Sequence, residues 1–203
     1  FARAIGLPCA PVDDLLTCHM VFGKSGPDVS INAVANLGYA NGSFEAPVYP
    51  GDTLSATSTV TGLKQNSNGK TGVVYVDTVG RNQDDAIVLR YSRWVMVHKR
   101  NHEAPVNEGV IPTLPDEVAP RDFHLPRQLR RLEHYDFELA GSPHRFGDYE
   151  VGEKIDHVAG TTIEEAEHQM ATRLYQNTSK VHFDQHAANE GRFKRRLVYG
   201  GHV

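Results

Sequence analysis

The chain has 203 residues, with 21 Lys or Arg against 25 Asp or Glu, so its formal net charge at pH 7 is −4. This slightly acidic balance argues against general binding to nucleic acids or to membrane surfaces. The sequence has no run of about 18 apolar residues, and its two cysteines, Cys9 and Cys18, are too few for a disulfide framework, so we expect a cytoplasmic protein.

The first predicted element is an amphipathic helix over residues 12–22. Its apolar side chains recur at helical spacing, Asp13 and Asp14 stand in the first turn, and Gly23 follows as a stop signal. Four apolar-rich runs separated by turn residues then follow, at 31–39, 54–63, 72–82 and 86–100. We therefore predict an α+β fold in which an antiparallel sheet wraps a buried helix.

The composition of the sequence changes at residue 101, where prolines become frequent. Residues 101–145 hold six of the chain's eleven prolines, which is typical of a linker that runs over a surface. Beyond the linker, residues 154–160 have the pattern of a strand. Thr162 and Glu165 have the spacing of a capping box, which predicts that a helix begins there.

These elements form a faint internal repeat. Residues 1–100 contain the central helix and the sheet of one repeat but lack the N-terminal part of that repeat. Residues 146–203 contain such an N-terminal part, and 197–203 resemble the start of a second such helix. Both ends look cut, because the chain begins with Phe1 and stops at Val203 in mid-pattern. We expect this segment alone to be weakly stable and to have little activity.

The residues best suited to chemistry lie near the end of the chain. Asn177 and His182 stand five residues apart and precede the glycine pair Gly200-Gly201. An imidazole can take or give a proton near neutral pH, and the N–H groups of a glycine-led helix start can hold a developing oxyanion. From these residues alone, each also has a simpler interpretation: His182 as a packed side chain, Asn177 as a helix C-cap and the glycines as a turn.

The same stretch resembles the hydratase motif of the MaoC-like dehydratases, Gly-Asp-x-Asn-Pro-Leu-His-x-Asp followed by two aliphatic residues and His-Gly. The motif's His and closing Asp fall on His182 and Asp184, whereas Asn177 replaces the motif's catalytic Asp and Gly200-Gly201 replace its His-Gly. Ser179 and Lys180 replace the motif's Asn and Pro. The resemblance continues through the segments 1–8, 32–39, 47–54 and 175–179. Their sequences are most similar to those of the family branch that converts mesaconyl-CoA to β-methylmalyl-CoA.

The resemblance implies a segment of a double hotdog fold and the reversible hydration of a branched, carboxylated enoyl-CoA. It implies that His182 transfers the proton, that Asn177 orients the water because an amide cannot act as a base, and that the Gly201 N–H holds the oxyanion. We also expect Tyr175, Ser179 and Gly200 to bind the substrate. Arg195 and Arg196 belong to a basic cluster at 192–196, which is either a solvated charge run or a site for CoA phosphates or a substrate carboxylate.

We expect no metal, since the eleven histidines show no paired metal-ligand spacing beside carboxylates, and no cofactor other than the CoA of the substrate. The expected partner is an acyl-CoA thioester, with no nucleic acid and no membrane, and we expect a homo-oligomer. Two other functions stay open: a hydratase or thioesterase for another acyl-CoA, or a non-catalytic hotdog module that only binds acyl-CoA.

Overall fold

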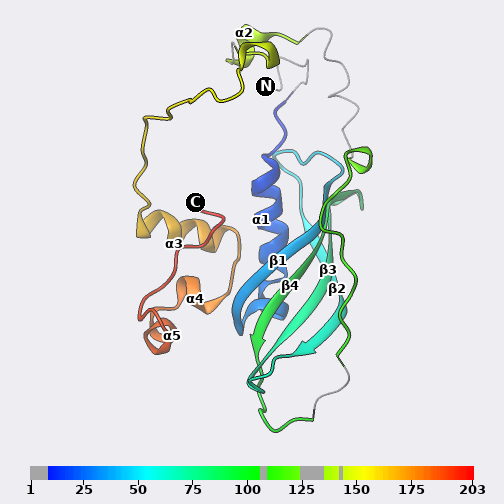
Figure 1. Ribbon diagram of the computed structural model, residues 1–203, viewed down its shortest axis with the longest axis vertical. Coiled ribbons are helices and arrows are strands. Elements are labelled where there is room, and N and C mark those ends of the chain that lie inside the picture. The colour runs from blue at the N-terminus through cyan, green and yellow to red at the C-terminus, as the bar shows by residue number, and fades with distance from the viewer. Residues whose placement is uncertain (1–8, 106–108, 124–134, 142–143) are drawn as a thin grey trace.

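The computed structural model describes residues 9–105, 109–123, 135–141 and 144–203, and its main body is a helix lying against a four-stranded sheet (Figure 1). The helix is α1 (Asp14–Lys24), followed by a short π-helical segment (Gly26–Ser30). The strands are β1 (Ala33–Phe44), β2 (Ser55–Gln65), β3 (Thr71–Arg81) and β4 (Ile87–His98).

The predicted helix is present, but it begins at Asp14 rather than at residue 12, because Asp13 is its N-cap: the Asp13 carboxylate accepts hydrogen bonds from the N–H groups of Leu15 at 2.8 Å and Leu16 at 3.3 Å. The expected stop at Gly23 is wrong, since the helix continues to Lys24. Gly23 instead lies against the backbone of Tyr175, and a Cβ at this position would overlap the Tyr175 carbonyl oxygen. The glycine marks a close approach between two distant parts of the chain.

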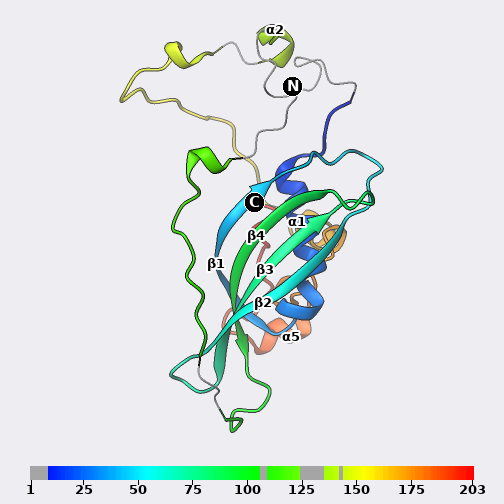
Figure 2. The ribbon, with the colours of Figure 1, turned by 90° about the vertical axis from the view of Figure 1, so that its right-hand side faces the viewer.

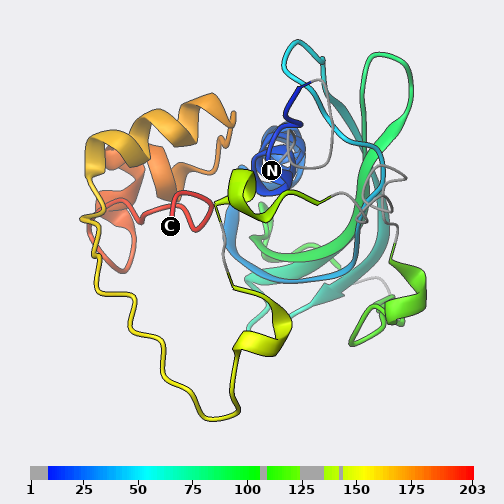
Figure 3. The ribbon, with the colours of Figure 1, turned by 90° about the horizontal axis from the view of Figure 1, so that it is seen from above.

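The sheet has the order β1-β4-β3-β2, and each neighbouring pair is antiparallel. It curves around α1, as Figure 3 shows along the helix axis. The core between the helix and the sheet consists of Val21, Val48, Val88, Leu89 and Tyr91. Gly80 of β3 admits Val21 so closely that an added Cβ would lie 2.7 Å from the valine side chain. The predicted α+β arrangement is confirmed.

The proline-rich segment follows the sheet before it leaves it (Figure 2). Val110 pairs with Leu63 at the edge of β2 through two backbone hydrogen bonds of 2.8 and 2.9 Å. Short helical pieces follow at Pro120–Asp122, α2 (Phe137–Ala140) and Phe146–Asp148. Residues 124–134 of the expected linker lie outside the described part of the chain.

Two local predictions for the second unit are wrong. Residues 154–160 are exposed and form no strand, because no other described segment pairs with them. The capping box is also absent: the N-cap of α3 (Glu165–Leu174) is Glu164, without a side-chain cap. The Glu165 carboxylate is occupied by the Arg195 guanidinium at 2.8 Å, so it does not reach back to Thr162.

The last part of the chain comprises α3, α4 (Lys180–Phe183), α5 (Gln185–Glu190) and an irregular segment to Val203. It lies beside α1 and β1 (Figure 1). Besides the Gly23 approach, the Lys24 ammonium donates to the Gln176 side-chain oxygen at 2.8 Å. These contacts place the candidate motif residues next to the first helix. Within the described residues, no helix is long and apolar enough to cross a membrane.

Candidate active site between the first helix and the C-terminal segment

A cavity of about 480 Å³ opens between the helix-and-sheet body and the C-terminal segment. Its floor and one wall come from α1, the π-helical segment, β1 and Val95 of β4; the other wall comes from residues after α3. The C-terminal lining residues are Asn177, Ser179, Val181, His182, Leu197, Tyr199, Gly200 and Gly201. The structure therefore brings together all three residues that the sequence predicts as catalytic.

The end of α3 places Asn177 in the cavity wall. Gln176 adopts a left-handed conformation with φ 57°, and its N–H donates to the Arg173 carbonyl at 3.0 Å. The Asn177 N–H donates to the Thr172 carbonyl, also at 3.0 Å, which completes a Schellman motif. The C-cap is Tyr175 and the left-handed residue is Gln176, so the alternative interpretation of Asn177 as the C-cap is wrong.

The Asn177 side chain is held in one orientation. It is almost fully buried, and its Oδ1 accepts a hydrogen bond from the Ser179 N–H at 3.0 Å. Because that oxygen is engaged, the Nδ2 group is the end that can donate to a water molecule in the cavity. Ser179 thus supports the asparagine through its backbone.

His182 lies on the short helix α4, and the segment around Leu197 passes beside it. The Leu197 N–H donates to the Val181 carbonyl at 2.9 Å, and the Leu197 carbonyl lies 3.0 Å from His182 Nδ1. A carbonyl only accepts, so Nδ1 carries the hydrogen and the neutral ring has its lone pair on Nε2. Burial lowers the pKa of His182 below its usual value, although the Leu197 carbonyl partly opposes this effect.

Gly200 and Gly201 lie in a turn that the His202 N–H closes by donating to the Tyr199 carbonyl at 2.9 Å. The helix expected to begin there stays a prediction. Gly201 packs against the His19 ring, and an added Cβ would overlap that ring and the Tyr199 ring. At Gly200, by contrast, an added Cβ would meet no atom within 4 Å. The second glycine is therefore required by packing.

Sequence reasoning missed three site residues, His19, Tyr199 and His168. His19 looked like one apolar-face position of α1, yet its Nδ1 lies 2.8 Å from the Tyr199 hydroxyl. The Tyr199 N–H donates to His168 Nε2 at 2.9 Å, so His168 is neutral in this arrangement. Burial lowers the pKa of both histidines and raises that of Tyr199. The one sequence signal that could have indicated this site was His19 itself, because it is a histidine in a helix face that is otherwise apolar.

Of the other predicted binding residues, some line the cavity and others lie outside its lining. Ser179 and Gly200 line it, whereas Tyr175 stacks on His19 with ring centroids 5.5 Å apart. Arg195 and Arg196 both approach the Glu165 carboxylate, at 2.8 and 3.6 Å. Arg195 also lines an adjoining cavity of about 270 Å³ that shares Ala33 and Val181 with the first. The proposed roles of these residues in substrate binding stay predictions.

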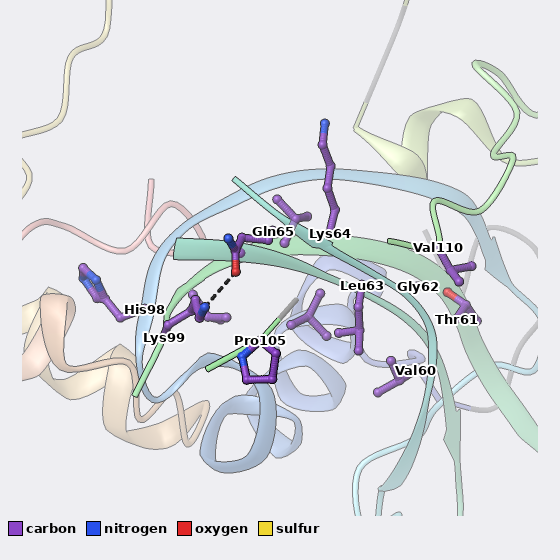
Figure 4. A pocket seen from close by; sticks show the side chains of 14 residues that line it. Val60, Thr61, Gly62, Leu63, Lys64, Gln65, His98, Lys99, Pro105 and Val110 are labelled. Atoms are coloured by element: carbon purple, nitrogen blue, oxygen red, sulfur yellow. Dashed lines mark hydrogen bonds between the residues drawn. The ribbon is translucent and has the colours of Figure 1, made fainter. Parts of the chain in front are cut away.

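A larger cavity of about 630 Å³ lies along β2 and β3 (Figure 4). Its lining is largely aliphatic, and Lys99 at its edge donates to the Gln65 side-chain oxygen at 2.7 Å. His98 is the one histidine in this lining, and neither an asparagine nor a pair of adjacent glycines accompanies it there. Chemistry therefore favours the smaller cavity. No group of three or more metal-ligating side chains occurs among the described residues.

The chain is similar in sequence to known proteins. Residues 12–91 match the family model described as FAS1-like, dehydratase domain region. Over 203 residues the chain is 61% identical to the β-methylmalyl-CoA dehydratase of Chloroflexus aurantiacus and 60% identical to the mesaconyl-CoA hydratase of Cereibacter sphaeroides. All of this chain is covered, but it spans only 57% and 58% of those two proteins.

The chain is also similar to solved structures. The crystal structure of a MaoC domain dehydratase from Chloroflexus aurantiacus J-10-fl superposes with a TM-score of 0.89 at 60% identity, covering 100% of this chain and 57% of that one. A Mycobacterium tuberculosis protein with a double hotdog fold superposes with a TM-score of 0.66 at 23% identity, covering 99% of this chain and 59% of the other, and shows the fold alone.

The chain has a hotdog fold, which its structural neighbours share. Along its entire length its sequence is similar to that of a MaoC domain dehydratase and to those of the β-methylmalyl-CoA dehydratase and the mesaconyl-CoA hydratase.

Proposed function

We propose that the protein catalyses the reversible hydration of mesaconyl-CoA to β-methylmalyl-CoA. The observation that carries this proposal is the cavity in which Asn177, His182 and Gly201 meet, in a chain about 60% identical to relatives with those names. Water adds as oxygen to one carbon of the double bond and hydrogen to the other. No electrons are gained or lost overall, so the proposed reaction needs no redox cofactor.

His182 is the proposed acid-base group. Its neutral tautomer has the hydrogen on Nδ1, held by the Leu197 carbonyl, and leaves Nε2 able to accept a proton from water. Burial favours this neutral form, since it lowers the pKa of the imidazole. In the dehydration direction, the same nitrogen returns the proton to the departing hydroxyl.

Asn177 and Gly201 are the proposed supports for the water and the thioester. The Asn177 Nδ2 group donates to the attacking water, because its Oδ1 is already engaged by Ser179. The Gly201 N–H donates to the thioester oxygen, where negative charge develops as water adds to the double bond. Asn177 stands where the motif has an aspartate, and an amide cannot act as a base. Proton transfer therefore falls to His182 or to the carboxylate of the substrate.

We further propose that the arginine side of the cavity receives the polar part of CoA. Arg195 is two-thirds exposed and lines the adjoining cavity together with Lys180 and Arg192, where cations suit phosphate groups. Tyr175 and Ser179 would help to shape the acyl site through their contacts with His19 and Asn177. A cytoplasmic homo-oligomer is part of the same proposal.

An absorbance assay of enoyl-thioester loss tests the reaction, with the intact protein and with mesaconyl-CoA and crotonyl-CoA compared side by side. We expect faster loss of mesaconyl-CoA. Preference for crotonyl-CoA would point to a hydratase for another acyl-CoA, and release of free CoA thiol would point to a thioesterase. Tight binding of acyl-CoA without turnover would identify a non-catalytic module and contradict the proposal.

A further inference from the structure

Arg93 of β4 is a buried cation without a counter-charge among the described residues. Its side chain is fully buried, and no described carboxylate forms an ion pair with it. Its Nη2 donates to the Ser25 hydroxyl at 2.9 Å, and the guanidinium lies over the Phe22 ring at 4.6 Å. Its Nε has no hydrogen-bond partner. Burying a charge in this way is costly unless an opposite charge compensates it.

The remaining contacts of Arg93 lead to the candidate active site. Its Nη1 donates to the Ser30 hydroxyl at 3.0 Å and lies 3.5 Å from Asn36 Oδ1, at the long end of a hydrogen bond. Ser30, Asn36 and Phe22 all line the cavity that contains His182. The cation therefore lies one side chain behind the cavity wall.

These contacts determine which polar groups face an occupant. Arginine has only donors, so the Ser30 and Asn36 oxygens must accept from it. The Ser30 hydroxyl hydrogen and the Asn36 Nδ2 hydrogens are then directed away from Arg93 and are available to the cavity. Two donors backed by a buried positive charge form a site that suits an anion.

We propose that Arg93, acting through Ser30 and Asn36, selects acyl groups that carry a free carboxylate. The inference rests on the proposed function, whose substrate has such a carboxylate on the carbon that receives the hydroxyl, and it assigns the group to a particular wall of the cavity. Arg93 is here a positioning residue, since the carboxylate would contact Ser30 and Asn36. An uncharged acyl group would leave the buried cation uncompensated.

The principal experiment compares kcat/KM of the intact enzyme for mesaconyl-CoA and for 2-methylcrotonyl-CoA, which has a methyl group in place of the carboxylate. Asn36→Asp removes the amide donors and places a carboxylate beside Arg93. We expect the preference for mesaconyl-CoA to fall by about 10- to 100-fold, mainly through KM, as for loss of a charge-assisted hydrogen bond. Asn36 is exposed, so this variant should fold normally.

Asn41→Asp is the matched control, because it makes the same charge change on the same strand outside the cavity lining. We expect it to keep the wild-type preference. Arg93→Lys should retain more of the preference than Arg93→Met, since only the lysine keeps a positive charge. Equal losses for both substrates in Arg93→Met, with an unchanged preference in Asn36→Asp, would show that Arg93 is purely structural and would overturn the inference.

A binding measurement separates this inference from the hydratase proposal. Methylsuccinyl-CoA and 2-methylbutyryl-CoA differ by the same carboxylate but have no double bond to hydrate. Calorimetry should show that wild-type protein prefers methylsuccinyl-CoA and that Asn36→Asp loses this preference. Such a result in a protein without hydratase activity would reject the proposed reaction alone. Equal affinities of the wild type for both compounds would reject the carboxylate site.

Discussion

At the residue scale, the candidate site depends on one imidazole whose tautomer is set by a backbone carbonyl. His182 donates through Nδ1 to Leu197 at 3.0 Å and keeps Nε2 for chemistry. We expect His182→Ala to lower kcat in the intact enzyme by about 10² or more, the usual contribution of an acid-base group. Steady-state kinetics with mesaconyl-CoA measure the effect, and near wild-type turnover would remove His182 from the mechanism.

The pH profile is a second test of His182. Burial lowers its pKa from 6.5, so the neutral, proton-accepting form persists below that pH in the folded protein. The decline of kcat/KM for hydration on acidification should therefore be centred below pH 6.5. A decline centred above pH 6.5 would mean that His182 is not the titrating base.

The glycine pair offers a matched comparison. Gly201→Ala should lower the unfolding free energy by about 1–3 kcal/mol, because the new methyl group would overlap the His19 and Tyr199 rings. Gly200→Ala should have little effect on stability, since its methyl group meets no atom within 4 Å. Denaturant unfolding of both variants measures the difference, and equal stability losses would contradict this packing of the turn.

At the element scale, α1 serves both as the core of the sheet and as one wall of the site. Val21 packs into the sheet, whereas His19, on the opposite side of the helix, contacts Tyr175 and Tyr199. The Schellman motif at the end of α3 brings Tyr175 against Gly23 and places Asn177 two residues further on. The position of Asn177 thus depends on how closely two helices approach.

Gly23→Ala tests this approach with a prediction of unusual sign. Alanine in place of a helix-interior glycine ordinarily stabilises by about 0.5–1 kcal/mol. Here the added methyl group would overlap the Tyr175 carbonyl oxygen, so we expect a lower melting temperature and reduced turnover. Gly160→Ala, at an open position, is the control. A stabilised Gly23→Ala variant would show that α1 and the end of α3 are further apart.

At the scale of the whole molecule, the boundary between the helix-and-sheet body and the C-terminal segment is rich in neutral histidines. His19, His168 and His182 all have lowered pKa values, with burial as the largest cause for each. The unfolded chain therefore binds more protons than the folded one when the pH falls below 6.5. Stability from these groups is fully present above that pH and is lost as the pH falls toward and below their folded pKa values.

We accordingly expect the melting temperature to drop between neutral and mildly acidic pH. Replacing His19 by Gln should reduce this pH dependence, because the amide cannot take up a proton in that range. Thermal unfolding of both proteins across the range measures the effect. A wild-type melting temperature that rises on acidification would contradict the assignment of these histidines as buried and neutral.

Elements whose signals are local can be predicted from the amino-acid sequence. Helix α1 follows from apolar residues at helical spacing, although its exact first residue does not, and the antiparallel strands follow from apolar runs separated by turn residues. The motif residues Asn177, His182 and Gly201 could be singled out because their spacing resembles a known family. Each of these inferences uses residues close together in the chain, where helical and strand periodicity operate.

The distant side chains that join this motif become known only from the fold. His19 meets Tyr199 across 180 residues, and Arg93 reaches the cavity through Ser30 across 63 residues. The strand pattern at 154–160 and the Thr162–Glu165 spacing failed for the same reason: a strand needs a partner, and the Glu165 carboxylate found Arg195 instead. Hydrogen bonds and buried charges are satisfied in three dimensions, so neighbours in sequence cannot reveal which distant group will satisfy them.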